Sequence, residues 1–360
     1  MTPRERFCAI ARGDRRGELF LPLNLNYAWF MDETLARWRT EGLPADVDLA
    51  GFFGFEKMAM TGGAPYSVLP QFAEETLAED DTTRTFRDGS GVVQRVFKHE
   101  TGSKMPQWLD YPVKTRADWL RLRKRLDPET PGRYPADWAA AAGEWNARET
   151  PLGLGPGSFF GHTLQRWVGT EQLCLLFYDE PALVEEMLEY LEWFFLELVT
   201  RYLRHGFRFD FASFGEDIAY KGRAFVSPAM FRRFLQPHYV RLCELMRSHG
   251  IETIFVDSDG DIAELIPLWL EVGVNGFSPL EVAAGMDALA LKRAYGDRLV
   301  LAGHIDKRAL IAGGAAIDAE VDKVRRLLDL GQYFPAVDHS VPQDVPYAHF
   351  RALLDRLHAL

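Results

Sequence analysis

The chain of 360 residues is 47% hydrophobic, 13% aromatic and 26% charged, which excludes a disordered tail, a coiled coil and a collagen-like rod. Lysine and arginine number 41 against 52 aspartates and glutamates, for a formal net charge of -11. This balance disfavours nucleic-acid binding as a main role, because phosphates are neutralised by basic side chains. No apolar run is long enough for a membrane span, and Cys8, Cys174 and Cys243 form no CxxC pair. We therefore expect a cytoplasmic protein.

The first part of the chain predicts an irregular start to an α/β fold. Residues 19–25 predict a first strand and residues 32–41 a helix, and a second strand is expected near residue 50. Aromatic and amide side chains straddle these first two strand ends, a mixture that is typical of an apolar pocket with a few orienting polar groups. The members that we expect to bind substrate are Asn24, Asn26, Tyr27, Trp29 and Phe55.

A β-hairpin is predicted next. Residues 82–87 and 92–98 are rich in β-forming side chains and flank Asp88-Gly89-Ser90-Gly91, which is a typical turn sequence. A hairpin interrupts an otherwise α/β pattern, so we interpret residues 82–98 as an insertion near one mouth of the main fold.

From residue 151 onward the chain repeats a strand–helix unit. Residues 151–155 predict a strand and residues 180–203 a long helix. An amphipathic helix, a glycine, a short apolar strand and then acidic or histidine side chains recur five times, with strands near residues 208, 252, 274, 299 and 332. The glycines suit left-handed helix caps, and strands that are apolar on both faces indicate a parallel sheet.

Eight strands can be counted in all, and right-handed crossovers close such a series most simply as a (β/α)8 TIM barrel. We expect a single barrel domain over residues 1–360, with an open doubly wound sheet as the alternative. The barrel is favoured because polar residues follow at least six strands, and TIM-barrel active sites lie at the C-terminal strand ends.

Acidic side chains follow two of these strands. Asp257 and Asp259 come directly after an apolar run and lie close to Asp261, so they need a cation, hydrogen-bond donors or raised pKa values. We expect Asp261 to cap the next helix and the other two to serve function. Glu216 and Asp217 also follow a strand and suit a general base, a metal ligand or a substrate anchor, with a structural ion pair as the alternative.

Histidines end the last two strands. His339 follows the final strand and His304 the one before it, where a histidine can transfer protons or bind a metal. For His304, donation to a neighbouring loop carbonyl is the alternative. Glycines at residues 153–161 lack the Lys-Ser/Thr of a phosphate loop, so no nucleotide site is predicted there. His162 and Gln165 are candidates to line the cavity.

Several of these stretches resemble one known family. The residues that carry the resemblance are 214–217, 220–221, 227–231, 256–260, 279–281, 303–307 and 338–339. Together they resemble the uroporphyrinogen decarboxylase superfamily, most specifically over residues 200–345. The resemblance implies a TIM barrel with its active site at the C-terminal mouth.

The resemblance implies one of two reactions, decarboxylation or corrinoid-dependent methyl transfer. True uroporphyrinogen decarboxylases are cofactor-free and carry an Arg-Gln-Ala-Gly-Arg segment near the first strand, whereas residues 23–29 here contain no arginine. Corrinoid-dependent methyltransferases that activate a thiol bind zinc through a His-x-Cys pair, a glutamate and a late cysteine, and this chain has no thiolate at those positions. An oxygen-plus-histidine site for zinc or another divalent ion is still implied, with the ligands Asp257, Asp259, Glu281 and His339.

We therefore predict a methyltransferase that demethylates a small substrate and passes the methyl group to a corrinoid protein. Its expected catalytic residues are Asp257, Asp259, His339 and Glu216. Asp217 and His304 are expected to bind substrate together with the pocket residues given above. The alternatives are a cofactor-free decarboxylase of a small carboxylic acid and a noncatalytic protein that binds a tetrapyrrole or a corrinoid. A homodimer is left open.

Overall fold

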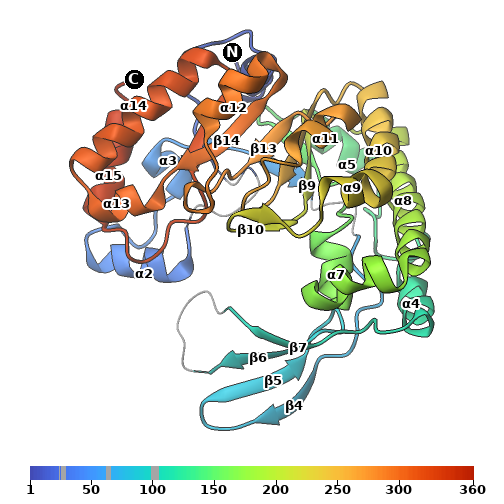
Figure 1. The fold of residues 1–360 in the computed structure, drawn as a ribbon. Coiled ribbons are helices and arrows are strands. Elements are labelled where there is room, and N and C mark those ends of the chain that lie inside the picture. Colours follow the sequence, from blue (N-terminus) through green and yellow to red (C-terminus); the bar gives the residue numbers. More distant parts are fainter. Residues whose placement is uncertain (24, 26–29, 62–65, 99–104) are drawn as a thin grey trace.

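The main sheet is parallel and buried on both faces. In this computed structural model, which describes all residues except 24, 26–29, 62–65 and 99–104, seven strands run in the order β15-β14-β13-β12-β9-β8-β3. β1 pairs in parallel with β2, which directly precedes β3, and β1 also lies against β15. The wall therefore closes as the expected TIM barrel (Figure 1). Its strands are β1 (Pro22–Leu23), β2 (Glu56–Lys57), β3 (Ala59–Thr61), β8 (Leu152–Leu154), β9 (Phe211–Gly215), β12 (Thr253–Asp257), β13 (Gly276–Ser278), β14 (Val300–Ile305) and β15 (Tyr333–Val337).

Helices cover the outside of the barrel. The long predicted helix is confirmed as α8 (Pro181–Arg204), whose buried leucines and phenylalanines pack on the sheet. Two short hairpin strands, β10 (Ala219–Tyr220) and β11 (Arg223–Ala224), follow β9 at the mouth. The other helices are α1 (Pro3–Ala11), α2 (Asp32–Thr40), α3 (Leu49–Phe53), α4 (Arg116–Leu122), α5 (Trp138–Asn146), α6 (Arg166–Val168), α7 (Thr170–Asp179), α9 (Pro228–Met230), α10 (Gln236–Ser248), α11 (Ile266–Val272), α12 (Ala288–Tyr295), α13 (Lys307–Ala312), α14 (Ala315–Leu330) and α15 (Tyr347–Leu357). Among the described helices, none has the length and apolar character needed to cross a bilayer.

The strand predicted near residue 50 is placed too early in the chain. Residues there form the short helix α3, which ends at Gly54 with a φ of 73°, a left-handed conformation that glycine adopts without strain. The strand begins only at Glu56. An apolar run of five residues fits a buried helix as well as a buried strand, so periodicity alone could not separate them.

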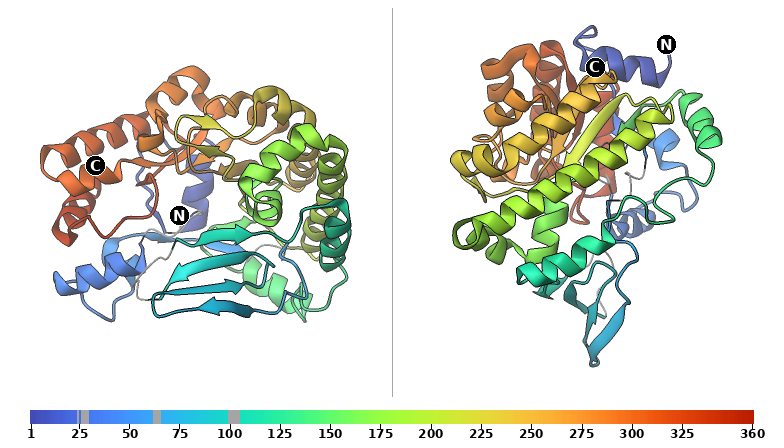
Figure 2. Two further views of the ribbon diagram at one scale, coloured as in Figure 1. Left: turned by 60° about the horizontal axis from the view of Figure 1, so that its bottom comes forward. Right: turned by 90° about the vertical axis from the view of Figure 1, so that its right-hand side faces the viewer.

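The predicted hairpin is confirmed and is part of a larger sheet. β5 (Thr83–Arg87) pairs antiparallel with β6 (Val93–Phe97), and two outer strands, β4 (Glu75–Glu79) and β7 (Gln107–Asp110), complete the order β4-β5-β6-β7. We call these four strands the inserted sheet. Figures 1 and 2 show it as a separate layer at the end of the molecule opposite the N-terminus.

An aromatic cluster closes the barrel at its N-terminal end. Phe7 of α1 stacks on Phe334 of β15 with 4.7 Å between ring centroids, and it also contacts Phe211 of β9 at 5.1 Å. Phe20 and Phe255 belong to the same buried cluster. Because this end is filled, the opposite end of the barrel, where the strands finish, is the one that can hold a site.

Candidate functional site

The predicted acidic side chains meet at the C-terminal mouth of the barrel. Asp257 is the last residue of β12 and is half-buried, and the hydroxyl of Ser278, at the end of β13, donates to its Oδ1 at 3.0 Å. Burial, followed by the charge of Asp217, raises the pKa of Asp257 to about 8. At neutral pH this side chain is therefore mainly a neutral carboxylic acid.

Two further aspartates and two histidines form a row across the mouth. His162 Nε2 lies 3.8 Å from Asp217 Oδ2, and Asp259 Oδ2 lies 3.5 Å from His339 Nε2. The backbone N–H of Asp259 donates to Asp217 Oδ1 at 3.4 Å, which links the two pairs. We call His162, Asp217, Asp259 and His339 the carboxylate–histidine row. The hydrogen bond to Asp259 raises the pKa of His339, whereas burial and then the charge of Asp259 raise the pKa of Asp217.

Asp217 reaches this position through an unusual backbone conformation. Its φ is 36°, in the left-handed region that non-glycine residues rarely occupy. Such strain persists only where the surroundings hold it in place, and here it directs the carboxylate toward His162 and the loop after β12.

Glu281 and Lys307 support the row from the side. Glu281 Oε2 accepts from the backbone N–H of Gly260 at 2.9 Å, and its Oε1 lies 3.4 Å from Lys307 Nζ. Asp338, which is fully buried, accepts from the backbone N–H groups of Lys307 and Val282 at 3.1 and 3.0 Å. Lys307 was not among the predicted site residues, although it ends the 303–307 stretch directly after β14.

Gly260 has to be a glycine at this turn. Its φ is +84°, and a Cβ there would lie 2.6 Å from the backbone nitrogen of Tyr220. The close approach packs the loop after β12 against the β10–β11 hairpin. The positions of Asp257 and Asp259 therefore depend on this backbone contact.

The four expected metal ligands are divided between separate contacts. His339 is paired with Asp259, while Glu281 is held by Gly260 and Lys307. Over the described part of the chain, no group of three or more His, Cys, Asp or Glu side chains is placed to hold a metal ion. The divalent ion is therefore not confirmed and stays a prediction.

Glu216, a predicted catalytic residue, is buried among backbone donors. The side chain is fully buried, and its carboxylate accepts from the backbone N–H groups of Phe159 and Phe160, both at 2.8 Å, and from the hydroxyl of Ser158 at 3.2 Å. These donors begin the π-helical turn Gly161–Gln165. Glu216 therefore positions the segment that carries His162. The local pattern does not distinguish Glu216 from Asp217, so it could not predict that Asp217 alone would face the mouth.

His304, a predicted substrate-binding residue, is held between two loops. It is buried, its Nδ1 lies 3.1 Å from the carbonyl oxygen of Leu280, and its Nε2 accepts from the backbone N–H of Ala288 at 3.2 Å. Burial lowers its pKa to about 4, so the ring is neutral. It joins two loops, which is the structural alternative considered for it.

The predicted aromatic pocket is only partly described. Phe55 is buried in the core against Phe30 and Phe53, with ring centroids 6.0 and 5.8 Å away. The other four members of that prediction, Asn24, Asn26, Tyr27 and Trp29, lie outside the described residues.

A cavity of about 450 Å³ lies beside the row, and we call it the mouth cavity. Asp217 and Asp259 of the barrel line this cavity together with Trp108 of the inserted sheet. Tyr111 and Phe225 line it too. Sequence reasoning found His162 and Gln165 but missed these three aromatic side chains. The positions of Trp108 and Tyr111 depend on how the inserted sheet packs, and that of Phe225 depends on the β10–β11 hairpin that it follows. The full lining is Met105, Trp108, Tyr111, Gly161, His162, Gln165, Arg166, Thr170, Asp217, Ala219, Phe225 and Asp259.

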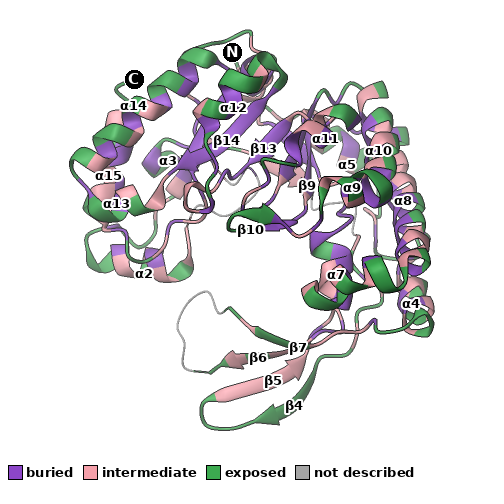
Figure 3. Cartoon of the chain, in the orientation of Figure 1, coloured by how far each residue is buried: buried purple, intermediate pink, exposed green. Residues whose placement is uncertain are grey.

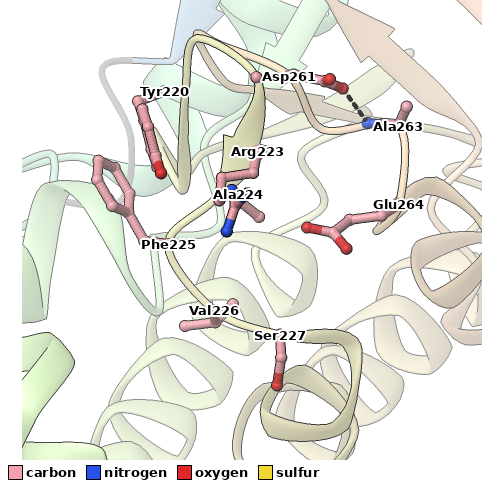
Figure 4. Close-up of a pocket in the computed structure, with 10 residues that line it drawn as sticks. Tyr220, Arg223, Ala224, Phe225, Val226, Ser227, Asp261, Ala263 and Glu264 are labelled. Carbon is pink, nitrogen blue, oxygen red and sulfur yellow. Dashed lines mark hydrogen bonds between the residues drawn. The ribbon is translucent and has the colours of Figure 1, made fainter.

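A second cavity, of about 700 Å³, lies on the other side of the β10–β11 hairpin. Figure 4 shows Arg223 and Glu264 on facing sides of it, and Asp261 accepting from the backbone N–H of Ala263. The Asp261 bond stabilises the turn before α11. The prediction that Asp261 caps this helix is wrong, because α11 begins at Ile266 and its N-cap residue, Leu265, makes no side-chain cap bond. Tyr220 stacks on Phe225 at 5.2 Å, and Phe225 separates the two cavities because it lines both of them.

The fold and this acidic mouth define a TIM-barrel protein whose polar residues converge at the C-terminal strand ends. The model of the uroporphyrinogen decarboxylase (URO-D) family matches residues 154–360, more than half of the chain. The chain belongs to this family.

Known relatives agree over shorter stretches. The chain is 30% identical over 131 residues to a uroporphyrinogen decarboxylase of Maricaulis maris, and 32% identical over 94 residues to that of Yersinia pestis strain Pestoides F. These matches span 36% and 26% of the relatives' lengths. A solved methyltransferase from Methanosarcina mazei has the same fold, with a TM-score of 0.56 and 15% identity over 100% of this chain and 99% of that one.

Proposed function

We propose that this protein is a methyltransferase that removes a methyl group from a small substrate and passes it to a corrinoid protein in the cytoplasm. The observation that carries the proposal is the place of Asp257 at the barrel mouth, where it ends β12 and accepts from Ser278 at 3.0 Å, and where burial raises its pKa to about 8. The Methanosarcina mazei neighbour is named a methyltransferase, and that name supports the choice of chemistry. The whole chain is proposed to act as one barrel unit.

Asp257 acts as the general acid. When the bond between the methyl carbon and its oxygen or nitrogen breaks, the bonding pair stays on the heteroatom, and the Asp257 proton passes to it. The corrinoid supplies the acceptor for the methyl group. His339, whose pKa is raised beside Asp259, is the group that we assign to return the proton to Asp257.

Decarboxylation is the second candidate, because the curated relatives are named uroporphyrinogen decarboxylase. The same acid would protonate the carbanion left after loss of carbon dioxide. We rank it lower because Asp217 and Asp259 repel an anionic substrate, and Arg166, a cation of the mouth cavity, is already paired with Asp88.

The test is methyl transfer from a panel of small methyl ethers and amines to reduced cobalamin. The absorbance spectrum of the cobalamin measures the transfer. We expect turnover that falls as the pH rises through about 8, because Asp257 then loses its proton. Asp257→Ala should abolish turnover and leave the circular-dichroism spectrum unchanged. Carbon dioxide release without methyl transfer would establish the decarboxylase instead, and spectral binding of cobalamin without turnover would establish a noncatalytic binding protein.

A further inference from the structure

The mouth cavity has one aromatic side. Trp108 is 46% exposed on β7 of the inserted sheet, and it lines the cavity together with Tyr111 and Phe225. Tyr111 is held in place against Gly169, where a Cβ would lie 2.4 Å from its ring. Phe225 is fixed by stacking on Phe160 at 6.1 Å. The aromatic side is therefore set by packing before any ligand enters.

The barrel side of the cavity is acidic. Asp217 and Asp259 face the cavity, and Asp257 lies close enough for its charge state to depend on Asp217. Arg166 lines the cavity too, but its guanidinium donates to Asp88 and to the hydroxyl of Ser90 at 3.3 Å.

Each of the two cavity carboxylates has one histidine beside it. His162 lies 3.8 Å from Asp217, and His339 lies 3.5 Å from Asp259. Both carboxylates still keep an open face, because 41% of the Asp217 side chain and 46% of the Asp259 side chain are exposed. A positively charged ligand in the cavity can therefore contact both of them.

A metal ion suits this space less well than an organic cation. The described residues hold no set of three or more ligands for one. An organic cation has no such requirement, since its charge is spread over alkyl groups that contact aromatic faces and need no coordinating atoms. A volume of about 450 Å³ is also within the range of small-molecule pockets.

We propose that the mouth cavity binds a small organic cation, with an ammonium headgroup placed between Trp108 and the carboxylates Asp217 and Asp259. This inference rests on the proposed function, because it names the class of substrate that the methyltransferase takes: a methyl ether whose ammonium headgroup anchors it, while the ether oxygen receives the Asp257 proton. The headgroup contacts the aromatic faces and its charge is offset by the two carboxylates. Substrates with a carboxylate at the same position are repelled.

The inference is tested by calorimetric titration with two probes of the same shape, choline and 3,3-dimethylbutan-1-ol, which differ in the positive charge. We expect choline to bind at least about tenfold more tightly than the neutral alcohol. Trp108→Leu and Asp259→Asn should each remove most of this preference. Trp193→Leu is the matched control, because Trp193 is 44% exposed on α8, away from the cavity, and its loss should leave binding unchanged.

Equal affinity for the two probes, or a preference that survives both cavity substitutions, would overturn the inference. The methyl-transfer assay separates it from the proposed function. Choline binding without methyl transfer from any substrate supports the cation site and overturns the methyltransferase. Methyl transfer from anionic or neutral ethers without choline binding supports the methyltransferase and overturns the cation site.

Discussion

The barrel and the inserted sheet differ in how their strands are buried. In β9, β12 and β14 nearly every residue is buried, whereas in β4 all five residues are exposed and in β5 all five are half-buried (Figure 3). The barrel therefore supplies the stability and fixes the acidic row. The inserted sheet adds Trp108 to the cavity while burying little of its own surface, so its sequence is free to change with the ligand.

The largest effect is expected from removing a ring in the aromatic cluster that closes the barrel at its N-terminal end. Phe334→Ala should lower the free energy of unfolding by about 3–5 kcal/mol, because the ring is fully buried and stacks on Phe7 at 4.7 Å. Urea unfolding measures the loss. A change in the free energy of unfolding below about 1 kcal/mol would show that this aromatic cluster is not tightly packed.

Glu216 distinguishes a positioning role from a catalytic one. Glu216→Gln replaces an acceptor of several backbone N–H groups with a side chain that has one acceptor oxygen, and should cost about 1–3 kcal/mol of stability. Activity of the folded fraction should fall through a raised KM, with the pH profile unchanged. A shifted pH profile would instead make Glu216 a proton-transferring group.

The raised pKa of Asp257 predicts how the stability of the protein changes with pH. Its pKa is about 8 in the folded protein against an ordinary 3.8, so between these values the folded state binds more protons than the unfolded state. Stability then falls as the pH rises through this window, by at most about 1.4 kcal/mol per pH unit from this group.

Asp257→Asn removes that titration. The variant should gain stability relative to the native protein as the pH rises from about 5 to about 8, and the gain should level off above about 8. Urea unfolding of both proteins across this range measures it. Parallel stability curves would show that the carboxyl is charged in the folded state.

The smallest effect is expected on the inserted sheet. Phe97→Ser should change the free energy of unfolding by less than about 0.5 kcal/mol, because the ring is 55% exposed at the end of β6. A loss as large as that of Phe334→Ala would show that Phe97 is covered in solution.

Local sequence patterns were enough to predict the barrel and the level at which its polar residues lie. Glycine-ended helices and apolar strands are local patterns, and parallel strands finish at one level, so the sequence places Asp257, Asp259 and His339 at one mouth, while their catalytic roles stay predictions. The strand near residue 50 failed because a short apolar run does not specify its own conformation.

Which polar side chains face the cavity depends on long-range packing. Glu216 and Asp217 are neighbours in the chain, yet one is buried under backbone donors and the other lies beside His162. The ion pair of Glu281 with Lys307 also joins two different strand ends, and local patterns did not predict it. Trp108 and Asp217 line one cavity because of where the inserted sheet packs. The direction of a side chain depends on contacts made by residues far apart in the chain, and local patterns carry no information about them.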